Sequence, residues 1–596
     1  MYKDRQNFDN LAWDKNDEAE EESQMRLRRK DTCRQVESLV KQKYGKLATI
    51  VSPLVIGGLN IHYRIHLEGE DSSSDVMVRL PWPSASCFPS EKILYEAATA
   101  EFLRLNTHIP SAQVLCYSQE SNVGPFLILR RIEHRGDMTD ALAVPDLDPN
   151  LTPVLNLELP ESKIRSLWGS IASCLLEIVK PTFPLIGSLI EVDGSFSIAA
   201  RPLTQNMGSM TQLAHIPPSI FPLEHKVYAT ADEWYVELAN MHLAQLIFQH
   251  NDLVSSEDED DCRNKYVARQ LFRRLAKEGR LSTFGFVQDD WSASAKTMHP
   301  ICPAPDTSGP FRFWCDDFRP ANVLLSPSLD DSVAAVIDWE FTYAAPTQFA
   351  LDPPWWLLFE TPEMWTSGIE AWSEAYEPVL RIWLDAMRDA EKGDGDGDEY
   401  LNGLSLSVYM RESWTMGRFW VNYAVRKSWA FDAVYWTFLD ERFFGERGGD
   451  GDGDGDGDGD GDGDGDGDGD GDGDGDGDGD GDGDGDGDGD GDGDGDGDGD
   501  GDGDGDGDGD GDGDGDGDGD GDGDGDGDGD GDGDGDGDGD GDGKELWKKR
   551  VDLLSEEERQ AMEPFVRRKM EESKERILVE WEPDEARKRL GELLFE

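Results

Sequence analysis

An uninterrupted Gly-Asp repeat occupies residues 449–542, which makes 94 residues and 47 copies of the dipeptide. The repeat has no apolar side chain whose burial could offset the loss of backbone entropy, and each Asp repels the next. We therefore expect a disordered insertion over residues 449–543. The favoured interpretation is an expansion without function, because a short echo at residues 393–398 suggests replication slippage. The alternative is a structural polyanion.

The rest of the chain has the composition of a soluble protein with two substantial cores. It holds all 18 Trp residues, and its seven Cys are scattered without CxxC spacing, which argues against a disulfide framework and a structural zinc site. The N-terminal segment lacks the apolar region of a secretory signal, and no window of about 18 apolar residues predicts a membrane span. The formal net charge of −73 comes mostly from the repeat, and no basic face is evident. We expect a cytoplasmic protein that binds neither nucleic acid nor membranes. The sequence is silent on its oligomeric state.

The first third of the chain predicts a small lobe. Residues 1–30 are polar and charge-rich, and we expect them to form a mobile tail. Short β-like runs, separated by Gly-Gly and by EGEDSSSD, predict an antiparallel meander. Residues 90–107 predict a helix capped by Ser90. We assign residues 31–140 to an α+β N-lobe.

The pattern then becomes mainly helical. We assign residues 141–448 to a C-lobe, and residues 544–596 to C-terminal helices packed on it. A capping box at Ser555 and Glu558 marks the start of one such helix. The acidic segment 255–261 predicts a solvated loop.

The stretch CDDFRPANVLL and the later VIDWE carry the chemistry that phosphoryl transfer from ATP requires. Transfer needs oxygen ligands for magnesium, a cation on the phosphates and a base for the acceptor hydroxyl. Asp317 is the candidate base, and Asn322 and Asp338 are candidate magnesium ligands. Two apolar runs between Asn322 and Asp338 predict a hairpin that returns both ligands to one end of adjacent strands. Magnesium favours such a set of few protein ligands and much water.

The predicted N-lobe supplies the candidate nucleotide-binding groups. Arg79, on one face of the strand VMVRL, is placed to reach phosphates, and Glu96 on the following helix is placed to pair with it. Gly57 and Gly58 can form a tight turn whose amides approach phosphates. A simple hairpin turn explains the two glycines equally well.

Arg319 has two interpretations. It neutralises the transferred group, or it anchors the loop to Glu340. Each of the other groups also has a plain structural alternative, as a turn residue, a hairpin cap, a surface cation or a solvated helix face. Glu101 competes with Glu96 as the partner of Arg79. A lone D-x4-N occurs often by chance, and only the joint order of strand Arg, helix Glu, D-x4-N, hairpin and IDWE favours a catalytic site.

Several blocks together carry a family resemblance: VMVRLPWP, YEAATAEFLRLNTHIPSAQV, CDDFRPANVLL, VIDWEFTYAAP, LDPPWWLL and LSEEERQAMEPFVRRKMEE. With them the chain resembles the aminoglycoside phosphotransferase and choline kinase superfamily, a branch of the protein-kinase-like fold, and within it the filamentous-fungal phosphotransferase-family proteins. The resemblance runs from about residue 35 to the C-terminus, apart from the repeat. It implies a two-lobed α+β fold, ATP with magnesium as cofactors, and transfer to a hydroxyl of a small molecule.

The chain departs from the family pattern at three places. Cys315 stands where the family loop usually carries a His, and a thiol is a smaller and weaker donor, which implies a less rigid loop. Arg79 stands at the family's Lys position, and VIGGLN is not a full G-x-G-x-x-G. These departures motivate a second hypothesis, a pseudokinase that binds nucleotide or a protein partner without turnover. No base partner for Cys315 is recognisable nearby in sequence, which argues against a nucleophilic thiol.

Overall fold

The computed structural model describes residues 9–71, 74–84, 86–145, 147–148, 151–253, 258–393, 403–447 and 545–595. The Gly-Asp repeat, for which the sequence predicts disorder, lies outside the described residues. None of the helices within the described ranges is long and apolar enough to cross a membrane.

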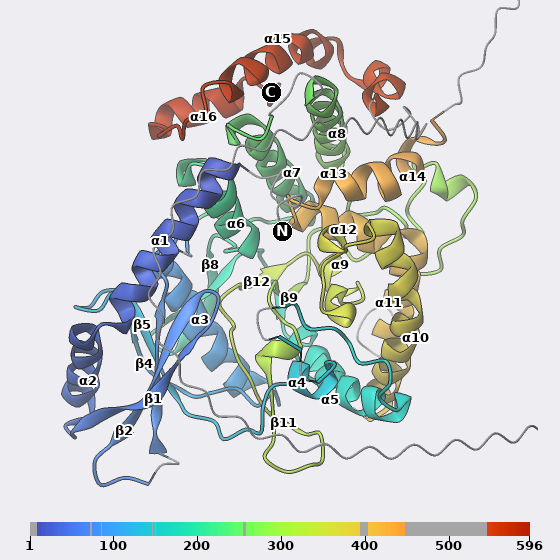
Figure 1. The fold of residues 1–596 in the computed structure, drawn as a ribbon. Coiled ribbons are helices and arrows are strands. Elements are labelled where there is room, and N and C mark those ends of the chain that lie inside the picture. The colour runs from blue at the N-terminus through green and yellow to red at the C-terminus, as the bar shows by residue number, and fades with distance from the viewer. Residues whose placement is uncertain are drawn as a thin grey trace, which may run out of the picture. The chain divides into compact units, whose positions relative to one another are not determined.

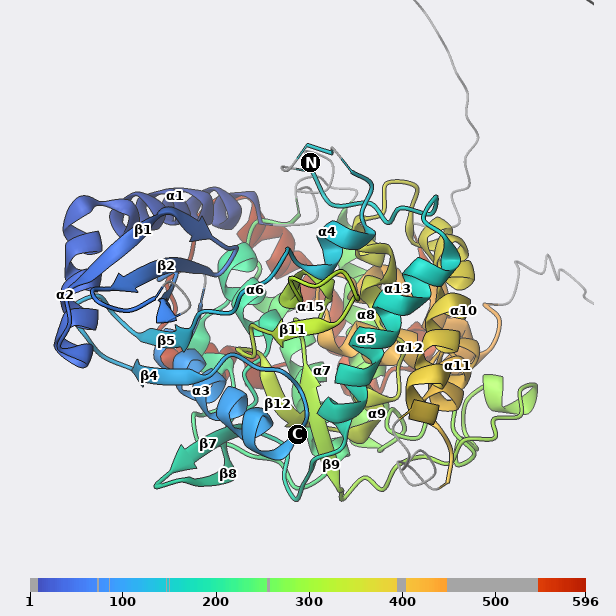
Figure 2. The same cartoon turned by 90° about the horizontal axis from the view of Figure 1, so that it is seen from below.

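A five-stranded antiparallel sheet forms the N-lobe (Figures 1 and 2). Its strand order is β1-β2-β3-β5-β4, so the predicted meander is confirmed for the first three strands. Glycines 57 and 58 lie in the turn between the first two strands. The strands are β1 (Ala48–Ile56), β2 (Asn60–Leu67), β3 (Val76–Pro81), β4 (Val114–Ser118) and β5 (Phe126–Arg130).

Helices cover both faces of this sheet. Helix α2 (Lys30–Tyr44) places Val36 and Val40 in one apolar cluster with alternate residues of β2, and it ends at Gly45, whose positive φ of 69° suits glycine. Helix α3 (Pro89–Asn106) contributes Ile93 to a cluster on the other face. The predicted helix is therefore present, but Phe88 rather than Ser90 occupies the capping position.

The expectation of a mobile tail over residues 1–30 is wrong for its described part. Helix α1 (Asn10–Arg28) begins at Asp9, whose carboxylate accepts from the Ala12 amide at 3.0 Å. Asp9 is fully buried and also accepts from the Asn251 amide at 3.0 Å. At the other end of the helix, the Tyr63 hydroxyl donates to the Leu27 carbonyl at 2.7 Å. Partners distant in sequence therefore order a helix whose own composition is polar.

The C-lobe is mainly helical and holds the largest apolar core (Figures 1 and 2). Its long helices are α5 (Glu161–Val179), α7 (Ala231–Phe248), α8 (Asp258–Lys277) and α10 (Ile369–Gly393). Shorter helices are α4 (Met138–Leu142), α6 (Gln205–Ala214), α9 (Thr347–Ala350), α11 (Leu406–Met416), α12 (Arg418–Arg426), α13 (Phe431–Val434) and α14 (Asp440–Phe444). Its strands are β6 (Thr182–Phe183), β7 (Ser188–Val192), β8 (Ser195–Ala200), β9 (Phe311–Cys315), β10 (Val323–Leu325), β11 (Val333–Val336) and β12 (Thr342–Ala345).

Two segments of the C-lobe differ from the sequence prediction. Asp258 to Asp261 form the first turn of α8 and are not a loop, because acidic side chains are stabilised at a helix N-terminus. Asp352 followed by Pro353 predicts an N-cap with proline at the first helical position, but Asp352 does not cap a helix. Its buried carboxylate accepts from the Ser413 hydroxyl at 2.6 Å, and a short 3-10 turn, Trp355–Leu358, follows instead.

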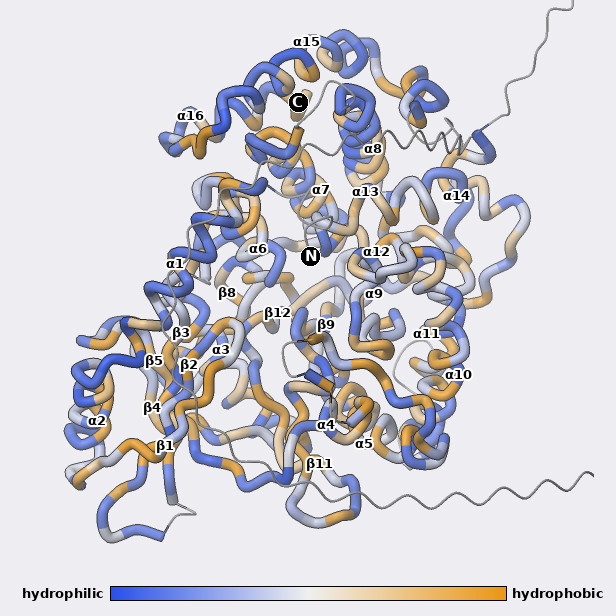
Figure 3. Tube along the Cα trace, viewed as in Figure 1, coloured by the Kyte–Doolittle hydropathy of each residue, from blue (hydrophilic) through white to orange (hydrophobic). Residues whose placement is uncertain are grey.

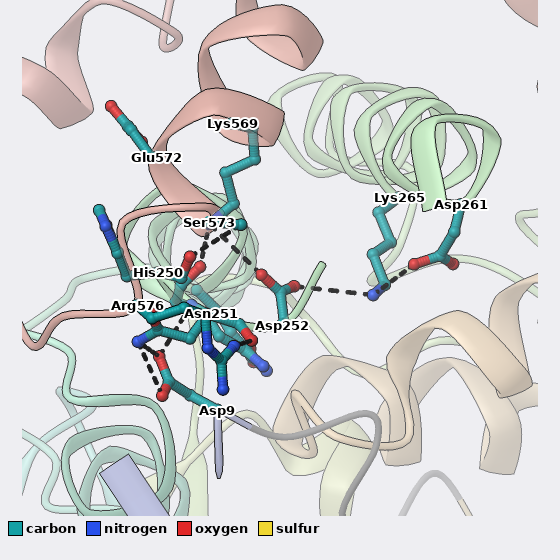
Figure 4. A network of polar contacts seen from close by, with 12 residues as sticks. Asp9, His250, Asn251, Asp252, Asp261, Lys265, Lys569, Glu572, Ser573 and Arg576 are labelled. Carbon is teal, nitrogen blue, oxygen red and sulfur yellow. Dashed lines mark hydrogen bonds and ion pairs between the residues drawn. The ribbon is translucent and has the colours of Figure 1, made fainter. Parts of the chain in front are cut away.

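The C-terminal segment packs on α7 and α8. Helix α15 (Glu556–Ser573) begins with the predicted capping box and is drawn mostly in blue in Figure 3, because most of its residues are hydrophilic. Close to its end, Lys569 donates to the Gln249 carbonyl and Ser573 donates to the His250 carbonyl at 2.8 Å (Figure 4). Ile577, Leu578 and Trp581 recur at helical spacing, but residues 574–582 are not helical, and α16 (Pro583–Gly591) follows.

The described residues on either side of the repeat meet at one carboxylate. Asp440, which is fully buried, contacts Arg550 Nε at 2.9 Å and Arg447 Nε at 3.3 Å. Arg550 also donates to the Gly445 carbonyl. Arg447 and Arg550, one before and one after the repeat in sequence, therefore lie within reach of the same side chain.

Candidate active site

The loop after β9 holds Asp317 and Asn322 in a fixed relation. Both side chains are buried, and the Asn322 amide nitrogen donates to the Asp317 backbone carbonyl at 2.8 Å and to its Oδ2 at 2.9 Å. A short 3-10 turn, Pro320–Asn322, leads from one residue to the other. The amide oxygen of Asn322 is thereby left for another partner, because the amide nitrogen is committed to Asp317.

The predicted hairpin after Asn322 is confirmed. Strands β10 and β11 pair antiparallel with Val323 opposite Val336, and the Ile337 amide donates to the Asn322 carbonyl at 3.0 Å. Asp338 follows directly with a positive φ of 65° and a partly exposed side chain. The hairpin therefore brings Asn322 and Asp338 to its one end. Positive φ is uncommon for Asp, and such backbone conformations cluster at functional sites.

Arg79 links the two lobes at this point. It lies on β3, is completely buried, and contacts Glu96 from α3, as the sequence pattern suggested. Its Nη1 also lies 3.0 Å from Asp338 Oδ1, and its Nη2 lies 2.6 Å from Glu340 Oε2. One guanidinium thus contacts two carboxylates of the C-lobe and one of the N-lobe. Glu101 does not compete for it, because it pairs with Arg104.

Lys92 and Glu340 belong to the same cluster, and the sequence analysis did not assign them there. Lys92 Nζ lies 2.8 Å from Glu340 Oε2 and 3.1 Å from Asn60 Oδ1. Lys92 lies one turn before Glu96 on α3. This spacing of four residues is the sequence signal that places both side chains on one face of the helix. Glu340 comes two residues after Asp338, and the sequence linked it to Arg319 instead.

Arg319 contacts Asp317 and not Glu340. Its Nε lies 2.8 Å from Asp317 Oδ1, while Glu340 is taken by Arg79 and Lys92. The suggested anchor to Glu340 is therefore wrong in this structure. The Arg319 side chain is 45% exposed, which leaves it accessible to a ligand.

The buried carboxylates of the cluster have opposite pKa shifts. Burial raises the pKa of Glu96, and Glu340 and Asp338 add to the rise against the opposing effect of Arg79. Burial acts in the same direction on Glu340, but Arg79 and Lys92 outweigh it and lower its pKa. Burial raises the pKa of Asp317, and Arg319 partly offsets the rise. Groups with separated pKa values in one buried cluster are typical of functional sites.

The other residues singled out by the sequence lie near this cluster. The Gly57 amide donates to the Asn60 carbonyl at 2.9 Å, so Gly57 and Gly58 form the turn that ends next to the Lys92 partner Asn60. Neither glycine has a positive φ. Burial raises the pKa of the Cys315 thiol well above its usual value, which fits the prediction that it is not a nucleophile.

The oxygen set at the hairpin end suits magnesium. Within the described ranges, no group of three or more His, Cys, Asp or Glu side chains is placed to hold a metal ion. Magnesium bound together with a nucleotide needs only one or two protein ligands, since phosphates and water complete its shell. Asn322 and Asp338 supply hard oxygen atoms of that kind.

Comparison with known proteins gave matches among solved structures only. No family model matches the chain, and no curated protein matches it. A thermostable mutant of aminoglycoside phosphotransferase APH(4)-Ia, in ternary complex with AMP-PNP and hygromycin B, is 14% identical. Its TM-score is 0.31, over 66% of this chain and 98% of that chain.

Two further structures match over a similar share of the chain. The GDP and kanamycin complex of APH(2")-IIia is 11% identical with a TM-score of 0.30, over 68% of this chain and 94% of that chain. A choline kinase from Cryptosporidium parvum is 9% identical with a TM-score of 0.32, over 66% of this chain and 87% of that chain. These aminoglycoside phosphotransferases and this choline kinase are proteins to which the chain is similar.

Proposed function

We propose that the chain is an ATP- and magnesium-dependent O-phosphotransferase that acts on a small hydroxylated molecule. The main support is the meeting of three groups at one place. Asp317 is held by Asn322, and Asn322 and Asp338 share the end of the β10–β11 hairpin. Phosphoryl transfer needs these parts and little covalent chemistry from the protein.

Each residue then has one task. Asp317 orients the acceptor hydroxyl and takes its proton, and its raised pKa makes it a stronger base than an exposed Asp. Asn322 and Asp338 would hold magnesium through their side-chain oxygens. Arg79 would meet the phosphates, with Glu96 keeping the guanidinium in place. When bound, ATP and magnesium supply the transferable phosphoryl group and the neutralisation of its charge.

Arg319 stabilises charge near the acceptor in this proposal. Its guanidinium lies next to Asp317 and is partly exposed, so a phosphoryl group entering the site can share it. The Arg319 cation also opposes the effect of burial on the pKa of Asp317 and so favours its ionised form.

The second candidate is a binding module without turnover. The observation that favours it is the contact between Arg79 and Asp338, because a cation there already neutralises the proposed metal ligand. Cys315, in the proposed catalytic loop, also favours a protein without turnover. Such a protein would bind nucleotide or a protein partner and leave phosphate untransferred.

The first experiment measures nucleotide binding by calorimetry, with and without magnesium, on the full chain and on Asp338→Ala. We expect magnesium-dependent ATP binding to the natural chain and its loss in the variant. Ser328→Ala, in the exposed turn of the same hairpin, serves as the matched control and should bind normally. If no nucleotide binds in any condition, both the phosphotransferase and the nucleotide-binding module are excluded.

The second experiment separates turnover from binding. A panel of hydroxylated small molecules, including aminoglycosides and choline, is screened for ATP consumption with Asp317→Asn as the control. Loss of the base should lower turnover by about 10²–10⁴-fold and leave ATP affinity within a few-fold. Nucleotide binding without turnover on any acceptor would favour the binding module.

A further inference from the structure

Lys92 is a completely buried cation at the edge of the candidate nucleotide site. It lies on α3, one turn before Glu96, and its side chain has no exposed surface. Its Nζ contacts Glu340 Oε2 at 2.8 Å, Asn60 Oδ1 at 3.1 Å and the Leu59 carbonyl at 3.5 Å. Lysine is almost never fully buried unless it is paired, and Lys92 is paired with Glu340 and Asn60.

The Glu340 carboxylate pairs with Lys92, and three donors share one of its two oxygens. Glu340 Oε2 contacts Lys92 Nζ at 2.8 Å, Arg79 Nη2 at 2.6 Å and Asn60 Nδ2 at 3.1 Å. Its other oxygen, Oε1, has only a 3.4 Å contact with Asn60. Within the described part of the chain, Arg79 Nε is also buried without a hydrogen-bond partner. Glu96 Oε2 is likewise buried without a partner, so the cluster as a whole has no excess of donors. Three donors nevertheless converge on Glu340 Oε2, and an incoming anion would give Lys92 another acceptor.

The position of Lys92 is also right for phosphates. It contacts Leu59 and Asn60, which directly follow the turn of Gly57 and Gly58 at the start of β2. Through Glu340 and Arg79 it belongs to the cluster that contains Asp338. A phosphate chain that runs from the glycine turn to Asp338 would pass both cations.

We propose that Lys92 is a second phosphate-binding cation, which exchanges Glu340 for a phosphate oxygen when nucleotide binds. This inference rests on the proposed function. Arg79 alone is not enough to bind the phosphates, because its planar guanidinium is already shared among three carboxylates, Glu96, Asp338 and Glu340. The Lys ammonium is a compact charge on a flexible stem and can move between neighbouring acceptors. Glu340 then acts as the resting partner that keeps the buried cation paired before nucleotide arrives.

The alternative role is a purely structural ion pair, and a paired substitution separates the two roles. Lys92→Met alone would remove one member of a buried charge cluster and destabilise the fold. The comparison is therefore between Glu340→Gln and the double variant Lys92→Met/Glu340→Gln. In both, the Glu340 charge is absent, and only the double variant also lacks the cation.

Calorimetry with magnesium-ATP, ADP and adenosine on these two chains tests the proposal. We expect the double variant to bind ATP and ADP about 10- to 100-fold more weakly than Glu340→Gln, as is typical for loss of a charge-assisted hydrogen bond. Adenosine carries no phosphate, so its affinity should be equal in both chains. Unfolding midpoints measured on each chain verify that both are folded.

Two outcomes overturn the inference, and they differ. Equal ATP affinity in the two variants would mean that Lys92 is only the ion-pair partner of Glu340, and the proposed function would stand. No nucleotide binding to the natural chain would remove the proposed function and this inference together. If the Met variant does not fold, Lys92→Gln/Glu340→Gln gives the same comparison, since an amide at position 92 can still hydrogen bond with Asn60.

Discussion

Cys315 lies two residues before Asp317, the candidate base, and its surroundings explain what it does there. It ends β9, faces Thr342 of β12 across the strand pair, and is 7% exposed. Burial raises the pKa of the thiol, so it stays neutral and unreactive at neutral pH. The thiol lies in the core, where it interacts with the Thr342 side chain and lines a cavity together with Phe318 and Trp355.

We predict that a His at this position does not repair the loop. Cys315→His should lower the free energy of unfolding by about 1–3 kcal/mol, because a larger polar ring must be buried in the core. Cys315→Ala, as the matched control, should keep nucleotide affinity and lose less stability. Urea unfolding and calorimetry measure both quantities. A His variant that is more stable and binds ATP more tightly would show instead that the loop lacks an architectural group.

His242 predicts how stability depends on pH. It is fully buried on α7, and burial together with Arg269 lowers its pKa to about 3, although Asp432 opposes the shift. The unfolded chain therefore binds more protons between pH 3 and about 6.5, and stability falls as pH falls through that window. From pH 7 to pH 5 this residue should cost about 2 kcal/mol. Urea unfolding of the natural chain and of His242→Gln at both pH values checks the difference, which should be smaller in the variant.

The candidate site was predictable where its residues are ordered along the sequence. Asp317, Asn322 and Asp338 lie within 22 positions on one loop and one hairpin, so local pattern was enough to bring them together. Lys92 and Glu340 were missed because their link is 248 positions long and depends on how two lobes close on each other. A local sequence pattern does not indicate which of several carboxylates a buried cation pairs with.

At the scale of elements, α15 is fixed by side chains that satisfy backbone carbonyls after α7. Lys569, which is 1% exposed, donates to the Gln249 carbonyl and lies 3.5 Å from Asp252 Oδ1. Arg576 donates to the Asn251 carbonyl at 2.8 Å. Asn251 in turn donates to Asp9 before α1, so α1 and α15 both depend on one short segment (Figure 4).

This arrangement predicts that substitution of Lys569 destabilises the fold strongly, whereas substitution of the nearby Lys574 has almost no effect. Lys569→Met should lower the free energy of unfolding by about 3 kcal/mol, because it leaves the Asp252 charge and the Gln249 carbonyl buried with fewer partners. Lys574→Met, at the exposed end of the same helix, should change it by less than about 0.5 kcal/mol. Chemical unfolding of the two variants measures the contrast. Equal effects would contradict the idea that these contacts hold α15.

Helix α1 shows why the fold was less predictable at its ends. Its residues have no apolar periodicity that would indicate a helix, and its fixed points, Asp9 and Leu27, bind Asn251 and Tyr63. The central strands and helices were predictable because their apolar residues alternate with the period of the element. Ends held by distant polar partners leave no such local signal.

For the whole molecule, the contacts of Asp440 with Arg447 and Arg550 predict that the repeat can be removed. Replacing residues 448–544 by a Gly-Ser linker of about ten residues should raise the free energy of unfolding by about 2 kcal/mol, since a shorter loop costs less entropy to close. Nucleotide affinity should not change. Thermal unfolding and calorimetry of the shortened chain check both statements, and a chain that no longer folds would give the repeat a structural role.

The same closure has a genetic consequence. Each doubling of the loop costs only about 0.6 kcal/mol, so adding or losing a few dipeptides is almost invisible to folding. A dipeptide corresponds to six nucleotides, and whole-unit gains or losses therefore preserve the reading frame after the repeat. Selection for folding of the two lobes therefore constrains the number of Gly-Asp copies only weakly. Sequencing this gene in many individuals should reveal alleles of different repeat length that share unchanged flanking codons.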